Sequence, residues 1–275
     1  MSIDYYSDFH LKEFQKIINK FKPEIENCRL KVTFRLTNLG LTKHIVDAIN
    51  SAFKQFNYVI VLEDDVIFTS ESIISVYDGI DEFGEKSDFG AISMFSPIHG
   101  KNLKKLLIGK NYWRKTNYFG PWGWATNKKT WLKYSNIISE SHSSKLKQSP
   151  IFSNMSKTSQ NVWNGRFGKV IFDPLKTWEF QFQHLLFREL LKVYAPVLTL
   201  SGNIGFDDLE ATNTKQKAPL WVTKKLSSIR TPKKMIKSKF VSNILMSIDK
   251  NTFSYDTRLS QLYLKLKKSI LFNNT

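Results

Sequence analysis

The chain has 275 residues, 41% of them hydrophobic and 14% aromatic, which is enough apolar material for one large domain with a buried core. Its single cysteine, Cys28, excludes an internal disulfide framework and a cysteine-based zinc site. The formal net charge is +17, and it is concentrated in residues 215–275, which hold 14 Lys and Arg against 2 Asp and Glu.

The first part of the chain predicts alternating strands and helices. Residues 3–6 predict a short strand that ends at Ser7 and Asp8, and apolar residues at helical spacing predict a helix over 11–21. Alternating apolar residues then predict a strand over 30–36. A turn at 38–40 leads into a helix over 42–56, for which Thr42 is the expected N-cap.

The apolar run at 58–62 (YVIVL) is typical of a strand buried on both faces of a parallel sheet. A helix from Ser70 to about Tyr77 and a strand over 89–93 follow it. The alternation predicts a Rossmann-like α/β fold with a mainly parallel sheet flanked by helices. In such sheets ligands bind beyond the carboxyl ends of the strands.

The second half of the chain is less regular. The polar stretch 142–159 predicts a loop, residues 179–194 a helix, and residues 196–200 a short strand. Helical spacing returns at 259–271. We therefore predict a domain over 1–214 and a basic, helical C-terminal extension over 215–275.

Three acids, Glu63, Asp64 and Asp65, directly follow the apolar run. Adjacent carboxylates repel each other, and their burial is unfavourable without a cation. A hard divalent ion with oxygen ligands, Mg²⁺ or Mn²⁺, removes that cost and can bridge a diphosphate. The alternative is a solvated acidic turn.

Five motifs in order carry a resemblance to a known family: NLGL at 38–41, VIVLEDD at 59–65, GPWGWAT at 120–126, WEFQ at 178–181, and GNIGF at 202–206 with Ala211-Thr212. Together, over residues 3–214, the chain resembles a group of bacterial GT-A glycosyltransferases, and more distantly animal N-acetylglucosaminyltransferases that share an EDD motif. The resemblance implies an enzyme that moves a hexose or N-acetylhexosamine from a nucleotide diphosphate donor to a glycan or lipid-linked acceptor, in cell-surface polysaccharide synthesis.

The resemblance also implies roles for single residues. Asp65 would bind Mn²⁺ or Mg²⁺ directly, and Asn213 stands where the family usually has a histidine that completes the metal site. Asp64 would face the ribose or a metal-bound water, and Glu63 would hold the neighbouring loop. The remaining donor-binding positions implied are Asp8, Asn38, Gly40, Gly123, Trp124 and Asn203. For Trp122 and Trp124 the alternative is core packing.

Glu179 is the candidate general base for inverting transfer, which needs a carboxylate to take the proton of the acceptor hydroxyl. The alternative is an exposed glutamate that a helix N-terminus favours. Asp207 and Asp208 are reserve candidates. His184 is expected to be structural.

The family's first strand–helix unit normally precedes the segment that residues 3–8 match, so the chain is expected to start one unit late, with an exposed sheet edge. This leaves open a degenerate, non-catalytic GT-A-like protein that binds sugar or a partner enzyme. Residues 1–10 carry Asp4 and Asp8 and lack the apolar run of a signal peptide. We therefore expect a cytoplasmic protein.

The basic extension predicts peripheral contact with the anionic inner face of the cell membrane, and the alternative is a solvated surface with no partner. A nucleic-acid-binding module is disfavoured, because the basic residues accompany no binding signature.

Overall fold

The structure is a computed structural model that describes residues 1–22, 29–98, 111–207, 222, 226 and 231–254. In chain order, the elements are β1 (Ser2–Ile3), α1 (Asp8–Phe21), β2 (Thr33–Phe34), α2 (Gly40–Phe53), β3 (Tyr58–Val61), β4 (Val66–Ile67), α3 (Ser70–Phe83), β5 (Phe89–Ser93), β6 (Trp113–Thr116), β7 (Trp124–Asn127), α5 (Lys128–Trp131), α6 (Glu140–Gln148), α7 (Pro150–Ser153), α8 (Lys157–Phe172), α9 (Glu179–Arg188), β8 (Lys192–Pro196), β9 (Gly202–Asn203), a 3₁₀ turn η2 (Gly205–Asp207) and α10 (Lys239–Ser254).

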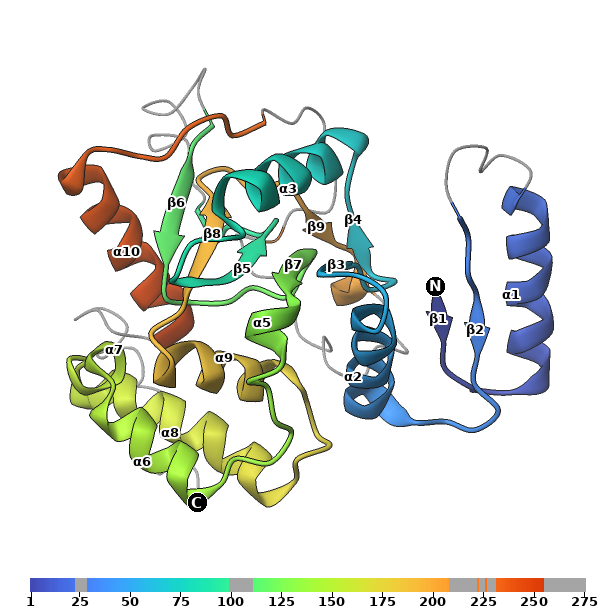
Figure 1. Cartoon of the computed structure of the whole chain (residues 1–275), viewed down its shortest axis with the longest axis horizontal. Coiled ribbons are helices and arrows are strands. Elements are labelled where there is room, and N and C mark those ends of the chain that lie inside the picture. The colour runs from blue at the N-terminus through green and yellow to red at the C-terminus, as the bar shows by residue number, and fades with distance from the viewer. Residues whose placement is uncertain (23–28, 99–110, 208–221, 223–225, 227–230, 255–275) are drawn as a thin grey trace, which may run out of the picture.

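The central sheet has the strand order β3-β7-β5-β8-β6 (Figure 1). Only β5 and β8 pair in parallel within it, whereas the β3–β7, β5–β7 and β6–β8 pairs are antiparallel. The α/β class is therefore confirmed, but the prediction of a mainly parallel sheet is wrong. The reason is that β7, from the segment that looked irregular, lies between β3 and β5 and runs opposite to both.

Two small sheets accompany the central one. β1 pairs in parallel with β2, and this ribbon lies with α1 to one side of the molecule in Figure 1. β4 pairs antiparallel with β9, so that Val66 lies opposite Asn203. The second pairing joins segments far apart in the sequence and positions the site described below.

The two faces of the central sheet are covered by different helices, because side chains alternate between the faces along each strand. Trp124 and Val193 pack with α2 and α9 on one face. Ala125 and Tyr194, the next residues along, pack with α3 on the other face. The helices predicted near 42–56 and 70–77 are both present, as α2 and α3.

Several element boundaries differ from the predictions. The stretch 142–159 is not a loop: it contains parts of α6 and α8 and all of α7, and serines are the N-cap residues of all three helices. Ser139 and Ser156 accept hydrogen bonds from the backbone amides of His142 and Ser159, which is how serine stabilises a helix start. Polar composition alone concealed these helices.

The helix predicted over 179–194 ends instead at Arg188. Leu190 adopts a left-handed backbone conformation with φ 58°, which breaks the helix, and β8 begins two residues later. Strand β8 therefore precedes the predicted strand at 196–200. Helix α3 begins at Ser70, after the N-cap Thr69. It continues to Phe83, beyond the predicted end near Tyr77, because its buried face extends that far.

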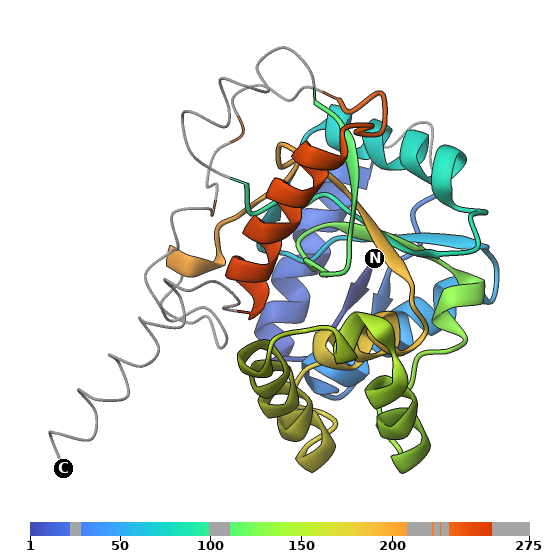
Figure 2. The same cartoon turned by 90° about the vertical axis from the view of Figure 1, so that its left-hand side faces the viewer.

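Part of the predicted C-terminal extension packs on the domain. Helix α10 lies against β6 and α8 (Figure 2), and the buried side chains of Arg114 and Asp249 form an ion pair across this contact. The predicted helix at 259–271 lies outside the described residues. Among the helices that the structure describes, none is both long and apolar enough to cross a membrane.

Candidate functional site

The acidic turn follows β3 and leads into β4. Within it, the Glu63 carbonyl accepts a hydrogen bond from the Val66 amide at 3.2 Å, and the Asp65 carbonyl accepts one from the Ile204 amide at 2.9 Å. The pairing of β4 with β9 thus brings residues 203–205 beside Asp65. Of the sequence-predicted site residues, Asp65 and Asn203 are brought together by this pairing.

The carboxylates of the turn are held at an electrostatic cost. Glu63 has its pKa raised from 4.5 to about 8, first by burial and then by the charges of Asp65, Glu179 and Asp64. Burial also raises the pKa of Asp65, while the Asn203 side chain partly offsets the increase. Acids that are buried beside other acids favour either protonation or a neighbouring cation.

Asn203 is fully buried and faces this carboxylate. Its Oδ1 accepts a hydrogen bond from the Gly205 amide at 2.9 Å. Its Nδ2 does not reach hydrogen-bond geometry with any group in the described part of the chain. A Cβ on Gly205 would approach Asp65 Oδ2 to 2.7 Å, so only glycine leaves the Asp65 carboxylate in place.

Glu179 occupies the first turn of α9 and is half-buried. Its pKa is raised by burial, which outweighs the opposing effect of the Arg166 charge. Because Glu179 also raises the pKa of Glu63, its carboxyl group lies within electrostatic range of the acidic turn. Glu179 is therefore not the freely exposed helix-start glutamate of the alternative interpretation.

Arg166 was missed by the sequence interpretation. It lies on α8, with its guanidinium 4.5 Å from the ring centre of Trp163 and 5.8 Å from that of Phe180. The signal that pointed to it was the Trp163–Arg166 spacing, which places both side chains on one helix face. The spacing indicates a shared face only once residues 157–172 are recognised as a helix.

Aromatic side chains border the turn. The ring of Trp122 is half-buried and meets Phe206 edge-to-face, with 5.7 Å between the ring centres. The Trp122 carbonyl accepts a hydrogen bond from Ser201 at 2.6 Å, which ties this loop to the chain just before β9. Trp122 therefore contacts Phe206, whose chain neighbour Gly205 lies against the Asp65 carboxylate.

The donor set fits a shared metal site and not a closed protein cage. Within the described residues, no three His, Cys, Asp or Glu side chains converge closely enough to hold an ion between them. Mg²⁺ in proteins is commonly bound by one or two carboxylates together with substrate phosphates and water. Asp65 has the half-buried carboxylate that a site of that kind uses.

Three predicted donor-binding residues have local partners instead. Strand β1 ends at Ile3, so the acid at its end is Asp4, which the sequence interpretation missed. The Asp4 carboxylate accepts hydrogen bonds from the amides of Leu39 and Gly40 at 2.9–3.2 Å, and the Asn38 side chain also accepts one from Gly40.

This arrangement corrects two expectations. Gly40 has φ 70° and opens α2, so Asp4 and not Thr42 caps that helix. Asp8 lies in the first turn of α1, where the Tyr5 hydroxyl donates to it at 3.4 Å, and not at a strand end. The amides of Leu39 and Gly40 are therefore engaged within the chain.

Trp124 was predicted to line the donor site, and that prediction is wrong for its side chain. It is fully buried and stacks on Trp178, with 5.1 Å between the ring centres. Core packing, the alternative, holds because residue 124 of β7 points towards α9. Gly123, predicted to line the same site, has φ 77° and packs so closely on Met94 that a Cβ would lie 2.6 Å from its sulfur.

His184 is buried in the core, as expected. Burial and the charges of Arg188 and His142 lower its pKa to about 3, so it is neutral. Asn213, Asp208 and the side chain of Asp207 lie outside the described residues.

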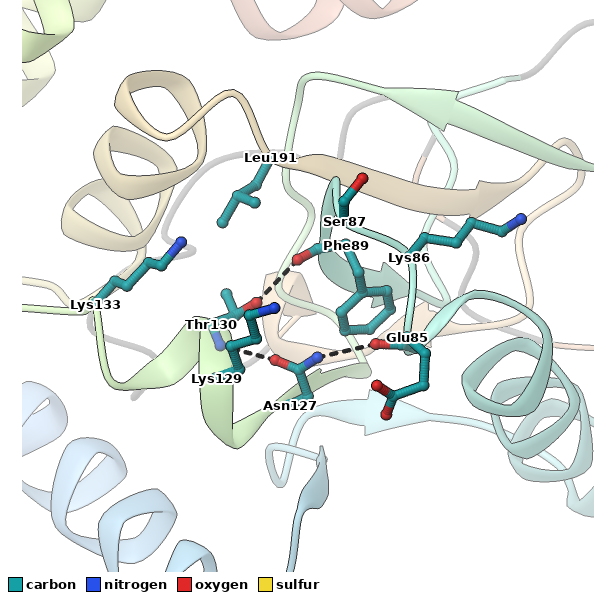
Figure 3. A pocket seen from close by; sticks show the side chains of 10 residues that line it. Glu85, Lys86, Ser87, Phe89, Asn127, Lys129, Thr130, Lys133 and Leu191 are labelled. Carbon is teal, nitrogen blue, oxygen red and sulfur yellow. Dashed lines mark hydrogen bonds between the residues drawn. The ribbon is translucent and has the colours of Figure 1, made fainter.

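A small, partly open pocket lies beside α5, lined by residues that include Asn127, Thr130 and Phe89 (Figure 3). Its volume of about 30 Å³ has room for no more than a few water molecules. The hydrogen bonds drawn there are internal, from Asn127 to the Gly84 carbonyl at 3.0 Å and from Thr130 to the Phe89 carbonyl at 2.9 Å. This cavity is too small for a nucleotide.

Two comparisons with known proteins, against family models and against curated proteins, identify no relative. No protein-family model matches the sequence, and no curated protein matches it at a significant level. The functional assignment therefore depends on the residues of the acidic turn and their neighbours.

Proposed function

We propose that the protein is a metal-dependent glycosyltransferase that uses a nucleotide diphosphate sugar as donor. The observation that carries the proposal is the position of Glu63 and Asp65, half-buried among other acids and with raised pKa values. A turn that keeps carboxylates in this state is suited to a cation and the diphosphate that the cation would bind.

The chain's own residues then divide the chemistry. Asp65, beside the buried side chain of Asn203, would hold Mn²⁺ or Mg²⁺, which would supply charge neutralisation for the departing diphosphate. Trp122 offers a half-exposed ring on which a sugar can stack.

Glu179 would act as general base. It would accept the proton of the acceptor hydroxyl as that oxygen bonds to the anomeric carbon, while the bond from this carbon to the diphosphate oxygen breaks. A raised pKa makes Glu179 a stronger base, and Arg166 keeps the pKa from rising further. The acceptor proposed is a glycan or lipid-linked sugar at the cytoplasmic face of a membrane.

The test is hydrolysis or transfer of nucleotide sugars by the full chain in the presence of Mn²⁺. We expect turnover that depends on the metal and that falls at least 100-fold in Asp65→Asn. The matched control is Asp78→Asn, an exposed Asp on α3. Turnover that persists in Asp65→Asn, or without the metal, would refute the proposal.

The second candidate is a non-catalytic protein that binds the nucleotide sugar. The observation that favours it is the lack of three convergent metal-binding side chains among the described residues. Saturable binding of donor to the wild type, with no product formed over a panel of donors and acceptors, would support this candidate over the enzyme.

A further inference from the structure

A second, larger cleft lies away from the acidic turn, between the segment after α5, the first turns of α6 and the C-terminal end of α9. Its volume is about 660 Å³, within the range of small-molecule binding sites. The lining residues that matter here are Lys133, Tyr134, Ser141, Lys145, Arg188 and Glu189. None of the acids proposed for glycosyl transfer lines it.

The cleft carries an excess of positive charge. Three cations converge on the single carboxylate of Glu189: Lys145 at 2.9 Å, Arg188 at 3.3 Å and Lys133 at 4.0 Å. Among the described residues, none of the three pairs with another carboxylate. One negative charge against three positive ones leaves a net charge of +2.

Arg188 is held rigidly and keeps donors to spare. Its side chain is almost fully buried. It donates to Glu189 and to the Lys133 carbonyl, and its third nitrogen faces Nδ1 of the neutral His184 at 3.4 Å. A guanidinium has five N–H donors, so two have no acceptor in the part of the chain that the structure describes. Buried donors of this kind are costly unless an acceptor arrives.

We propose that this cleft binds a phosphate monoester group. A phosphate dianion matches the +2 excess, and its oxygens match the spare donors of Arg188, since arginine binds phosphate through parallel hydrogen bonds. Ser141, in the first turn of the nine-residue α6, adds a hydroxyl at a helix end that favours negative charge. The ring of Tyr134 provides an apolar wall for the group that the phosphate carries. The site is independent of glycosyl transfer.

The test is titration of the full chain with inorganic phosphate at low salt, followed by calorimetry or ³¹P NMR. We expect saturable binding that Lys145→Gln weakens by about two- to fivefold, the effect of one partly exposed ion pair. The matched control is Lys147→Gln on the same helix, since Lys147 does not line the cleft. Arg188 is left intact because its bond to the Lys133 carbonyl supports the fold.

A variant with the opposite sign sharpens the test. Glu189→Gln removes the carboxylate that competes for the three cations, and phosphate should then bind more tightly. Equal weakening by Lys145→Gln and Lys147→Gln, or the lack of saturable binding to the wild type, would overturn the proposal. So would weaker binding to Glu189→Gln in a variant that folds normally by circular dichroism.

Two sources of phosphate are then separated by glycerol 3-phosphate and by vesicles that contain phosphatidic acid. If Lys145→Gln reduces vesicle pelleting and Lys147→Gln does not, the site takes a lipid headgroup. If both variants pellet as the wild type does while glycerol 3-phosphate binding depends on Lys145, the site takes a soluble phosphate ester. Either result supports the site.

Discussion

The ion pair between Arg114 on β6 and Asp249 on α10 is the contact whose loss should be most damaging to the fold. The two side chains are 3% and 0% exposed, and they share two hydrogen bonds, of which the Nη2–Oδ1 bond is 3.0 Å long. Asp249→Asn removes the negative charge and leaves the guanidinium buried without compensation. Breaking a buried pair in this way costs about 3–5 kcal/mol.

That cost is large beside the total stability of about 5–15 kcal/mol typical of a folded domain. For a urea slope of about 3 kcal/mol/M, the unfolding midpoint should fall by about 1–2 M. The assay is urea unfolding followed by tryptophan fluorescence, with Asp78→Asn, at an exposed site on α3, as the matched control.

Replacement of both partners provides a second measurement. Arg114→Met combined with Asp249→Leu removes both charges, and the double variant should recover most of the stability lost in Asp249→Asn. A free energy of unfolding for Asp249→Asn within about 0.5 kcal/mol of that of Asp78→Asn would refute the reasoning. So would a double variant less stable than Asp249→Asn.

Three further predictions concern the acidic turn and its neighbours. Glu63 has a folded-state pKa near 8, against an ordinary value of 4.5, so its ionisation destabilises the metal-free fold progressively as the pH rises between these values. Glu63→Gln should therefore raise the unfolding midpoint more at pH 8 than at pH 5. An equal effect at both pH values would contradict this. Glu179→Gln should abolish transfer while the protein still folds, as judged by circular dichroism. Wild-type activity should decline as the pH falls through the raised pKa of Glu179, because the base must be ionised. Unchanged kcat in Glu179→Gln would remove it as the base. Gly205→Ala should displace the Asp65 carboxylate, because the added Cβ would approach it to 2.7 Å, and should thereby weaken the Mn²⁺ dependence of turnover. The control is Gly165→Ala, where the added Cβ meets open space and should leave the Mn²⁺ dependence unchanged. Equal responses of the two variants to Mn²⁺ would show that the position of Asp65 does not matter.

The sequence was a good guide where one helix face is apolar and the other polar. Helix α1 begins at Asp8 after the N-cap Ser7 and extends to Phe21, close to the predicted 11–21. Helix α2 buries Ile45, Ile49 and Phe53, the residues that the spacing had selected. This apolar periodicity is a property of the local sequence, so it predicts a helix regardless of which segments pack against that helix.

The sequence was a poor guide to strand pairing. The run at 58–62 looked like an interior strand, but β3 forms an edge of the five-stranded sheet, and all four of its residues are only half-buried. β6 and β7 were missed because each has only four residues, with polar and aromatic side chains intermixed. Direction and neighbour in a sheet depend on contacts between distant segments, which short strands do not encode.

For the candidate site, the sequence by itself determined the acidic turn, because three consecutive carboxylates directly follow an apolar run. Only the tertiary structure decided which residues join them. Pairing of β4 with β9 brings Asn203 to Asp65, the start of α9 brings Glu179 within range of Glu63, and the alternation along β7 sends Trp124 into the core. Burial and charge repulsion exist only after these segments meet, and therefore so do the raised pKa values that give the acids their proposed role.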